Sequence, residues 1–198
     1  MIVETHRMRL RPVDPLDIDD LVQLDSDPAV MRFVSGGLPT SRTEIADWVV
    51  PRAQSELRGG RGGMWVATDE RYHSFLGWIV LRAPRHSHRP ELELSYRLRR
   101  ETWGRGLATE AARAIVTVAF DSLGAQRVFA STTRTNTPSL RVMKKLEMSP
   151  STDRPDPAGS AASEHHLDDI EYELLRARWS SVAARWYPHR TYAANLTA

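Results

Sequence analysis

Apolar and polar residues alternate over several short stretches of the chain, and alternation of this kind predicts half-buried β-strands. In residues 91–98, Leu92 and Leu94 fall on one face of the expected strand, whereas Glu91 and Glu93 fall on the other. Together with short runs of β-prone residues, the pattern predicts strands at residues 7–11, 64–68, 75–81, 91–98, 128–132 and 170–175.

Apolar residues at helical spacing predict helices between these strands. The clearest helix spans residues 107–120, where positions 107, 111, 114, 115 and 118 form one apolar face. Another spans residues 14–24. Ser41 and Glu44 form a capping-box pattern that opens a further helix, and we expect Pro51 to kink or end it. The expected apolar face of that helix consists of Ile45, Trp48 and Val49.

A last helix is expected to begin at Thr137, which is suited to the N-cap position, with Pro138 at the first helical position. Residues 149–169 are rich in Ser, Pro, Ala and Asp and predict a long exposed loop. Interleaved short strands and helices indicate one α/β or α+β domain around a mixed sheet. We expect this domain to span residues 1–179 and to be followed by a tail at residues 180–198.

Composition narrows the classes of chemistry. The chain has 198 residues, 41% of them apolar, and no cysteine, which excludes disulfides, thiolate metal sites and a cysteine nucleophile. Its 27 basic residues include only two lysines, Lys144 and Lys145, and we attribute the excess of arginine mainly to codon bias rather than to binding. A formal charge of +2 argues against a nucleic-acid partner.

Two further features concern location and surface charge. The first residues, Met1-Ile2-Val3-Glu4, have no secretory signal, and residues 111–120, the most apolar run, are too short to span a membrane, so we expect a cytoplasmic protein without a membrane partner.

Aspartates are frequent in residues 14–27, and we interpret them as a solvated helix face.

The most informative segment is Trp103-Gly104-Arg105-Gly106-Leu107-Ala108-Thr109-Glu110, which lies between a predicted strand and a predicted helix. Two glycines separated by one residue allow a tight turn whose backbone N–H groups, with the positive end of the helix dipole, can bind a phosphate. The alternative is that these glycines only turn the chain. A P-loop is excluded because no GxxxxGK[ST] is present, and Thr109 replaces the third glycine of a dinucleotide fingerprint.

At these residues the chain resembles the GCN5-related N-acetyltransferases (GNAT), and within them the RimJ/RimL-like branch that acts on ribosomal proteins. The resemblance covers residues 4–179. It is carried by the segments Glu93-Leu94-Ser95-Tyr96-Arg97-Leu98, Trp103 to Ala111, Asn136 to Leu146, Glu4 to Arg11 and Asp27-Pro28.

The resemblance implies an α+β fold: a twisted, mixed and mostly antiparallel central sheet flanked by helices and splayed between its fourth and fifth strands. It also implies acetyl-CoA as the donor, with no metal and with direct transfer to an amine. Backbone N–H groups of residues 104–108 would hold the pyrophosphate, and the strand edge at Leu98 and Arg99 would pair with the pantetheine arm. The cofactor-binding residues carried over are Leu98, Arg99, Gly104, Arg105, Gly106, Leu107, Ala108, Thr109, Asn136, Ser139 and Lys145.

Two residues are candidates for proton transfer. Glu93 stands where the family often has a glutamate, and we expect it to take the proton of the amine, although it is equally placed to be a solvated carboxylate. Ser139 would donate a proton to the departing thiolate, or would simply belong to the first turn of its helix. We expect Tyr96 to pack in the core.

The sequence also departs from the family pattern. Glu101 opens the phosphate turn, where a glutamine or arginine is usual, and we expect its carboxylate to point away from the pyrophosphate. Glu147 replaces a glycine after the Lys-Leu pair, where a left-handed residue would cost about 1 kcal/mol.

The acceptor is open at this point. A protein N-terminus is the first candidate, a small amine such as an antibiotic, a polyamine or an amino-acid derivative is the second, and an acyl-CoA-binding module without turnover is the third. A homodimer is compatible with the resemblance.

Overall fold

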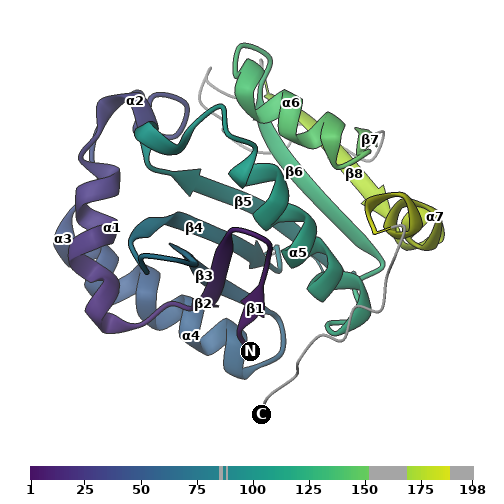
Figure 1. The fold of residues 1–198 in the computed structure, drawn as a ribbon, viewed down its shortest axis with the longest axis horizontal. Coiled ribbons are helices and arrows are strands. Elements are labelled where there is room, and N and C mark those ends of the chain that lie inside the picture. Colours follow the sequence, from purple (N-terminus) through teal and green to yellow (C-terminus); the bar gives the residue numbers. More distant parts are fainter. Residues whose placement is uncertain (85–86, 88, 152–168, 188–198) are drawn as a thin grey trace.

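One sheet forms the centre of the structure, and its eight strands follow the order β1-β2-β3-β4-β5-β6-β8-β7 (Figure 1). The computed structural model describes residues 1–84, 87, 89–151 and 169–187. Neighbouring strands are antiparallel except for the parallel pair β5–β6, which confirms the expected mixed, mostly antiparallel sheet. The strands are β1 (Val3–Glu4), β2 (Met8–Pro12), β3 (Gly62–Asp69), β4 (Phe75–Arg82), β5 (Glu91–Leu98), β6 (Arg127–Thr133), β7 (Ser149–Pro150) and β8 (Asp169–Leu175).

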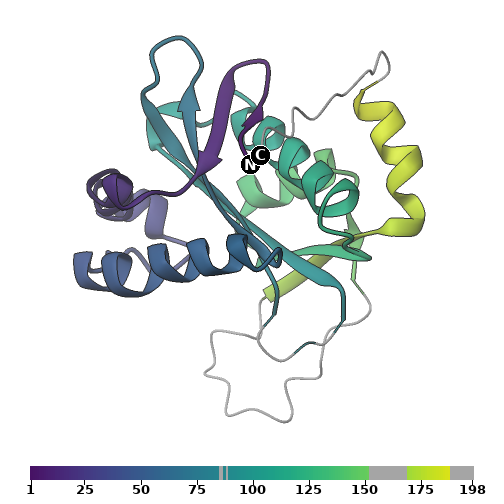
Figure 2. The ribbon, with the colours of Figure 1, turned by 90° about the horizontal axis from the view of Figure 1, so that it is seen from below.

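Helices cover both faces of this sheet (Figure 2). On one face, α1 and α4 pack on a core that contains Leu21, Val50 and Val66. On the other, α5 packs on a larger core that contains Leu94 and Ile115. The helices are α1 (Ile18–Asp25), α2 (Pro28–Met31), α3 (Arg42–Glu44), α4 (Val50–Arg58), α5 (Leu107–Asp121), α6 (Thr137–Lys145) and α7 (Arg176–Trp186).

The parallel strands β5 and β6 pair over only three residues each, Glu91–Glu93 with Arg127–Phe129, and then diverge (Figure 1). We call the part of the sheet where they no longer pair the β5–β6 split. It lies between the fourth and fifth of the strands predicted from the sequence, so the expected splay is confirmed.

Arg127 holds the closed end of the split. Its guanidinium donates to Glu91 on β5 at 2.8 Å, to Glu173 on β8 at 2.6 Å, and also to Glu171 on β8. All four side chains are largely buried, so these charge-assisted bonds are little screened by water. The vertex where the strands separate is therefore fixed by one arginine and three carboxylates.

The helix that begins after Ser41 differs from the expectation. The Ser41 hydroxyl accepts the Glu44 N–H at 3.1 Å as an N-cap, but the helix does not end at Pro51 and continues to Arg58. A π-helical turn at Ile45–Val49 precedes the proline, and a wider turn gives room for a residue that lacks an N–H. Because this turn changes the helical phase, Trp48 is 73% exposed and does not join the expected apolar face.

Two boundaries near α6 also differ. Asn136, not Thr137, caps this helix, because its side-chain oxygen accepts the Ser139 N–H at 3.3 Å. Ser149 and Pro150, expected in a loop, form β7 by pairing with Glu173 and Tyr172 of β8. Residues 152–168, the rest of the expected loop, lie outside the described residues.

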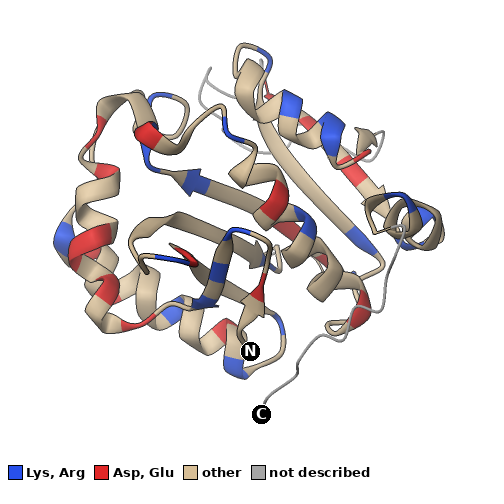
Figure 3. Ribbon diagram, in the orientation of Figure 1, with Lys and Arg blue, Asp and Glu red and all other residues tan. Residues whose placement is uncertain are grey.

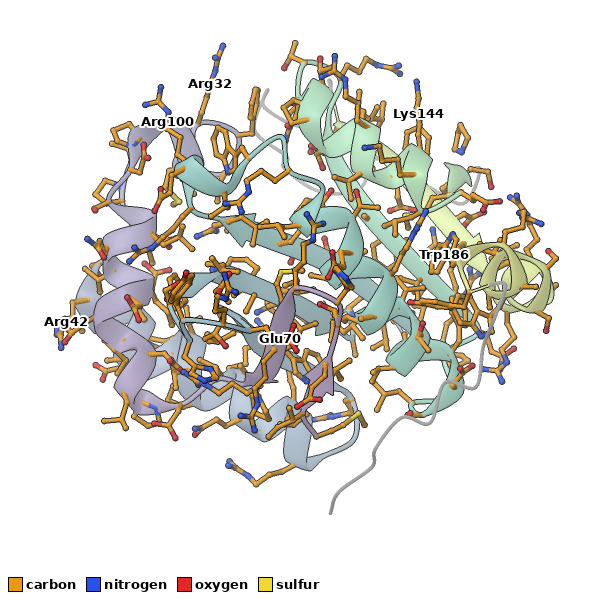
Figure 4. All side chains as sticks on the ribbon, in the orientation of Figure 1. Arg32, Arg42, Glu70, Arg100, Lys144 and Trp186 are labelled. Atoms are coloured by element: carbon orange, nitrogen blue, oxygen red, sulfur yellow. The ribbon has the colours of Figure 1, made fainter. Side chains whose placement is uncertain are left out.

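The C-terminal segment continues the packed structure beyond residue 179. Trp179, Val182 and Trp186 of α7 are all buried in the larger core, and Trp186 lies between α7 and the helices beside it (Figure 4). Trp179 stacks on Phe120 of α5 with 5.0 Å between ring centroids. The domain boundary expected between residues 179 and 180 thus falls inside a helix whose buried residues lie on both sides of it.

Candidate active site

The turn between β5 and α5 is built on two glycines in the left-handed region of backbone conformation. Gly104 has φ +74° and Gly106 has φ +79°, and Gly106 is the N-cap of α5. Such angles are strained for residues with a Cβ atom, which explains why both positions are glycine. The chain can therefore reverse tightly and enter α5 at Leu107.

This turn presents unpaired backbone donors at the positive end of a helix. Among the described residues, none accepts a hydrogen bond from the N–H groups of residues 104–108. In the first turn of α5, the N–H of Glu110 donates to the Gly106 carbonyl at 3.1 Å. The first N–H groups of any helix lack partners within it, and the helix dipole adds positive potential there. The arrangement suits an anionic group such as a pyrophosphate.

Within the part of the chain that the structure describes, the edge of β5 that faces the split also has unpaired backbone groups. Arg99 N–H donates to Leu76 on β4 at 2.8 Å, while Leu98 lies opposite Gly77. In an antiparallel ladder the backbone groups of successive residues point alternately toward and away from the neighbouring strand. Because Arg99 bonds to β4, the backbone groups of Leu98 and Tyr96 point away from β4 and toward the split. The indole N–H of Trp103 already caps the Leu98 carbonyl at 2.8 Å, which leaves the Leu98 N–H and both backbone groups of Tyr96.

Arg99, expected beside the pantetheine arm, faces the opposite way. Its side chain donates to Asp20 at 3.2 Å and to Gln23 at 2.5 Å, both on α1, and Glu101 lies 3.7 Å from it. The Glu101 carboxylate is thus paired on the α1 side. Among the described residues, the backbone groups of β5 that remain free at the split are both groups of Tyr96 and the N–H of Leu98, whereas the Arg99 N–H is bonded to β4.

The aspartates of α1 are not a purely solvated face. Acidic residues lie along α1, and basic residues lie beside them at the end of β5 (Figure 3). Asp25 is buried and accepts two bonds from Arg97 at 2.6 Å, and the buried Asp17 pairs with Arg11 at 2.5 Å. These ion pairs correct the sequence interpretation, and the one between Arg97 and Asp25 holds the end of β5 that leads into the phosphate turn.

Ser139 and Tyr96 meet across the split. Their hydroxyl oxygens are 3.0 Å apart, and the Tyr96 hydroxyl is also 3.4 Å from the Ser139 carbonyl. Burial raises the pKa of the Tyr96 hydroxyl to about 12, so it is protonated at neutral pH. The sequence indicated a core role for Tyr96. The signal for a polar role in the sequence is that Tyr96 carries a hydroxyl group on a strand face that is otherwise made of leucines.

Asn136 sets the position of Ser139. Besides capping the Ser139 N–H, its amide donates to the Thr132 hydroxyl at 2.9 Å and so ties the start of α6 to β6. Both ends of the amide are thus used to hold the helix start.

Glu93 is the last residue of β5 that pairs with β6, and it lies opposite Arg82 on β4 and Phe129 on β6. Its carboxylate has no hydrogen bond or ion pair with any described residue. Burial raises the pKa of this carboxyl more than the positive charge of Arg82 lowers it, and the charge of Glu171 acts in the same direction as burial. By strand alternation Glu93 lies on the sheet face opposite Tyr96, with the split beginning between them.

The remaining carried-over residues are placed as follows. Arg105 is exposed on the turn, Ala108 and the buried Thr109 belong to the first turn of α5, and Lys145 is exposed in the last turn of α6. At 1.5 Å per residue, Lys145 lies about 9 Å along the helix from Ser139. Arg100 and Lys144 project outward (Figure 4).

Glu147 follows α6 in the left-handed region, with φ +56°, as its place in the pattern implied. Its carboxylate accepts from the Nε of Arg185 on α7 at 2.9 Å, and this bond lowers the pKa of the Glu147 carboxyl.

The split in the sheet and the two-glycine turn beside it are the two features that the resemblance to the GNAT family implied. Comparison with known proteins identifies the same family. The profile of the acetyltransferase (GNAT) domain matches residues 7–149. The chain belongs to the GNAT acetyltransferase family, whose members use acetyl-CoA.

Individual relatives differ in what their names describe. The chain is 28% identical to an FsC-acetyl coenzyme A-N(2)-transacetylase of Aspergillus fumigatus, over 94% of this chain and 83% of that protein. It is 32% identical to the protein YkkB of Bacillus subtilis, over 73% and 83%. Mycobacterium smegmatis RimJ, solved in complex with CoA-disulfide, shares the fold with a TM-score of 0.75 at 17% identity, over 95% and 93%.

Among the described residues, no helix has the length and apolar character to cross a membrane. No group of three or more potential metal ligands occurs in that part of the chain.

Proposed function

We propose that the protein is an acetyl-CoA-dependent N-acetyltransferase that transfers the acetyl group directly to a primary amine. The observation that carries this proposal is the set of unpaired N–H groups at residues 104–108, which lies at one end of the unpaired edge of β5. That edge leads from the turn to a hydroxyl pair on one face of the sheet and a carboxylate on the other. The absence of cysteine agrees with a mechanism without a cysteine acyl-enzyme.

The residues present fit acetyl-CoA. The N–H groups of residues 104–108 would bind its pyrophosphate, and the free backbone groups of Tyr96 and Leu98 would pair with the amides of its pantetheine arm. Asn136 would act by placing Ser139. Bound in this way, acetyl-CoA supplies the acetyl group as a thioester.

The side chains at the vertex of the split would move two protons. Glu93 accepts a proton from the ammonium, directly or through a water, so that the nitrogen lone pair can attack the acetyl carbon, and the second N–H proton leaves to water as the amide forms. Ser139 donates its proton to the sulfur as the carbon–sulfur bond breaks, Tyr96 returns a proton to Ser139, and exchange with water then restores Tyr96 and Glu93. The raised pKa of the Glu93 carboxyl makes it a stronger base than an ordinary carboxylate, and the raised pKa of the Tyr96 hydroxyl keeps its proton available for donation at neutral pH.

Two classes of acceptor have support. The shared fold with RimJ and the motifs of the RimJ/RimL-like branch support a protein N-terminus. The likeness to an N(2)-transacetylase over 94% of the chain supports a small-molecule amine. We place the protein N-terminus first because the branch motifs cover most of the domain.

A thiol-release assay tests the proposal. Acetyl-CoA is incubated with the protein and either N-terminal peptides or small amines, and free CoA is measured. Release with peptides supports the first acceptor, and release only with small amines supports the second. Binding of acetyl-CoA, seen as a rise in melting temperature, without release for any acceptor would instead indicate an acyl-CoA-binding module.

A further inference from the structure

The phosphate turn, residues 104–108, is contacted by an arginine near the N-terminus of the chain. Arg7 lies in the turn between β1 and β2, and its Nη1 donates to the Arg105 carbonyl at 2.8 Å. Its Nη2 is 3.7 Å from the point where a Cβ at Gly106 would be. The guanidinium is therefore packed directly against the two-glycine turn, on the carbonyl side rather than the N–H side.

The same arginine binds a carboxylate in the first turn of α5. Arg7 Nε donates to Glu110 Oε2 at 2.7 Å, and the Arg7 backbone N–H donates to Oε1 at 2.9 Å. The Thr5 hydroxyl is a third donor to the carboxylate, with its bond of 2.7 Å to Oε1. One residue thus connects the turn carbonyl and the helix carboxylate, although they are separated from it by about a hundred positions in the sequence.

The charge of Glu110 makes this connection matter for anion binding. Burial acts to raise the pKa of the Glu110 carboxyl, but the hydrogen bonds from Thr5 and Arg7 outweigh it and hold the pKa below its ordinary value. Glu110 is therefore a carboxylate at neutral pH. A negative charge in the first turn of α5 would repel a pyrophosphate at the N-terminus of that helix, unless a nearby positive charge cancels it.

We infer that Arg7 is a positioning residue for the pyrophosphate: it fixes the two-glycine turn through the Arg105 carbonyl and neutralises Glu110 beneath the anion site. This inference rests on the proposed function, because it assigns a role in binding acetyl-CoA. It makes the β1–β2 turn part of the acetyl-CoA site, although this turn lies far in the sequence from residues 104–108. Arg7 itself acts through Arg105 and Glu110 and does not take part in the chemistry.

The first test replaces Arg7 with glutamine and compares two acetyl donors. We expect Arg7→Gln to raise the Kd for acetyl-CoA, measured by calorimetry, by about tenfold and to leave kcat within about twofold of wild type. With S-acetylpantetheine, which lacks the pyrophosphate, the same variant should have an unchanged KM. Arg9→Gln is the matched control. Arg9 lies two residues after Arg7, in β2, and among the described residues its side chain makes no hydrogen bond or ion pair with the phosphate turn.

The second test separates charge neutralisation from general damage. Glu110→Gln removes the repulsive charge, so Arg7→Gln/Glu110→Gln should recover most of the acetyl-CoA affinity lost in Arg7→Gln alone. If Arg7→Gln does not fold, Arg7→Lys gives the same comparison, with an expected rise in Kd of about threefold because the charge remains and the fork is lost.

Two results would overturn the inference: an unchanged Kd for acetyl-CoA in Arg7→Gln, or a double variant that binds no better than the single one. Failure of the wild-type protein to bind acetyl-CoA at all would contradict the proposed function instead, so the two are distinguished by the wild-type titration.

Discussion

The phenolic oxygen of Tyr96 lies 3.0 Å from the Oγ of Ser139, so one hydrogen bond joins β5 to α6 across the split in the sheet. These residues are 43 positions apart and belong to two different motifs of the chain. The bond brings together two hydroxyl groups at the place where the proposed transfer would release a thiolate.

Replacing Tyr96 with phenylalanine should slow turnover without weakening donor binding. The ring and its packing remain, while the hydroxyl that returns a proton to Ser139 is lost, so we expect kcat to fall about tenfold. Ser139→Ala should have the larger effect, of about 100-fold, because it removes the proposed donor itself. Steady-state kinetics and calorimetric titration check both variants. Equal kcat values in Tyr96→Phe and wild type would leave the phenol a packing group.

Glu93→Gln should change the pH dependence of kcat. The pKa of Glu93 is raised, so in wild type kcat should increase as pH rises through a value above the ordinary carboxyl pKa of about 4.3. Because the base is ionised only above its pKa, the loss in Glu93→Gln should be largest there, about 100-fold, and should shrink at lower pH. A variant profile parallel to that of wild type at every pH would argue that Glu93 is not the base.

The same substitution should stabilise the fold at neutral pH. A carboxyl whose pKa is raised on folding binds more protons in the folded state, so wild type loses stability as pH rises from the unfolded to the folded pKa. Glu93→Gln lacks this loss. Its Tm should therefore exceed that of wild type at pH 7, and the difference should vanish below about pH 4. Thermal scans across this range test the sign.

Gly104 and Gly124 form a matched pair for testing the phosphate turn. Both have positive φ, +74° and +67°, and a Cβ at either would meet nothing within 4 Å. Each change to alanine should therefore cost about 1 kcal/mol of unfolding free energy from backbone strain. Only Gly104→Ala should also weaken acetyl-CoA binding, by about tenfold, since only this residue lies in the anion site. Similar affinities in the two variants would place the pyrophosphate elsewhere.

Glu147 allows a test of backbone strain outside the site. Its φ of +56° is unfavourable, but its carboxylate binds Arg185. In an Arg185→Ala background the ion pair is absent, so Glu147→Gly should raise the free energy of unfolding by about 1 kcal/mol. Chemical denaturation measures this directly. A lower unfolding free energy would show that the side chain stabilises the fold through other contacts.

Local patterns in the sequence predicted the elements well where one face of each is buried. The alternation in residues 91–98 gave both the strand and its two faces, and the periodicity of residues 107–118 gave α5 with its buried side. Trp48 was misplaced because a π-helical turn before Pro51 changes the helical phase, which a fixed helical period does not include. β7 is too short to have a pattern of its own and exists because β8 pairs with it.

The candidate site was predictable only in its local parts. The two-glycine turn and its helix are contiguous in sequence, so their chemistry could be inferred from residue types. The contacts of Tyr96 with Ser139 and of Arg7 with Glu110 join distant segments, and no spacing rule encodes them. The partial burial of Glu93 depends likewise on strands that come from different parts of the chain.

The split in the sheet also sets a length. β5 and β6 last pair at Glu93, two residues beyond the Glu91 carboxylate that binds Arg127, and β5 ends at Leu98, ahead of the phosphate turn. Five residues of extended strand separate these ends, a distance of about 17 Å. If the proposed function holds, a donor bound at the turn by its phosphates would have to bridge this span to bring its carbonyl beside Glu93. The length of this strand segment would then select donors by the reach of their arm rather than by the group they carry.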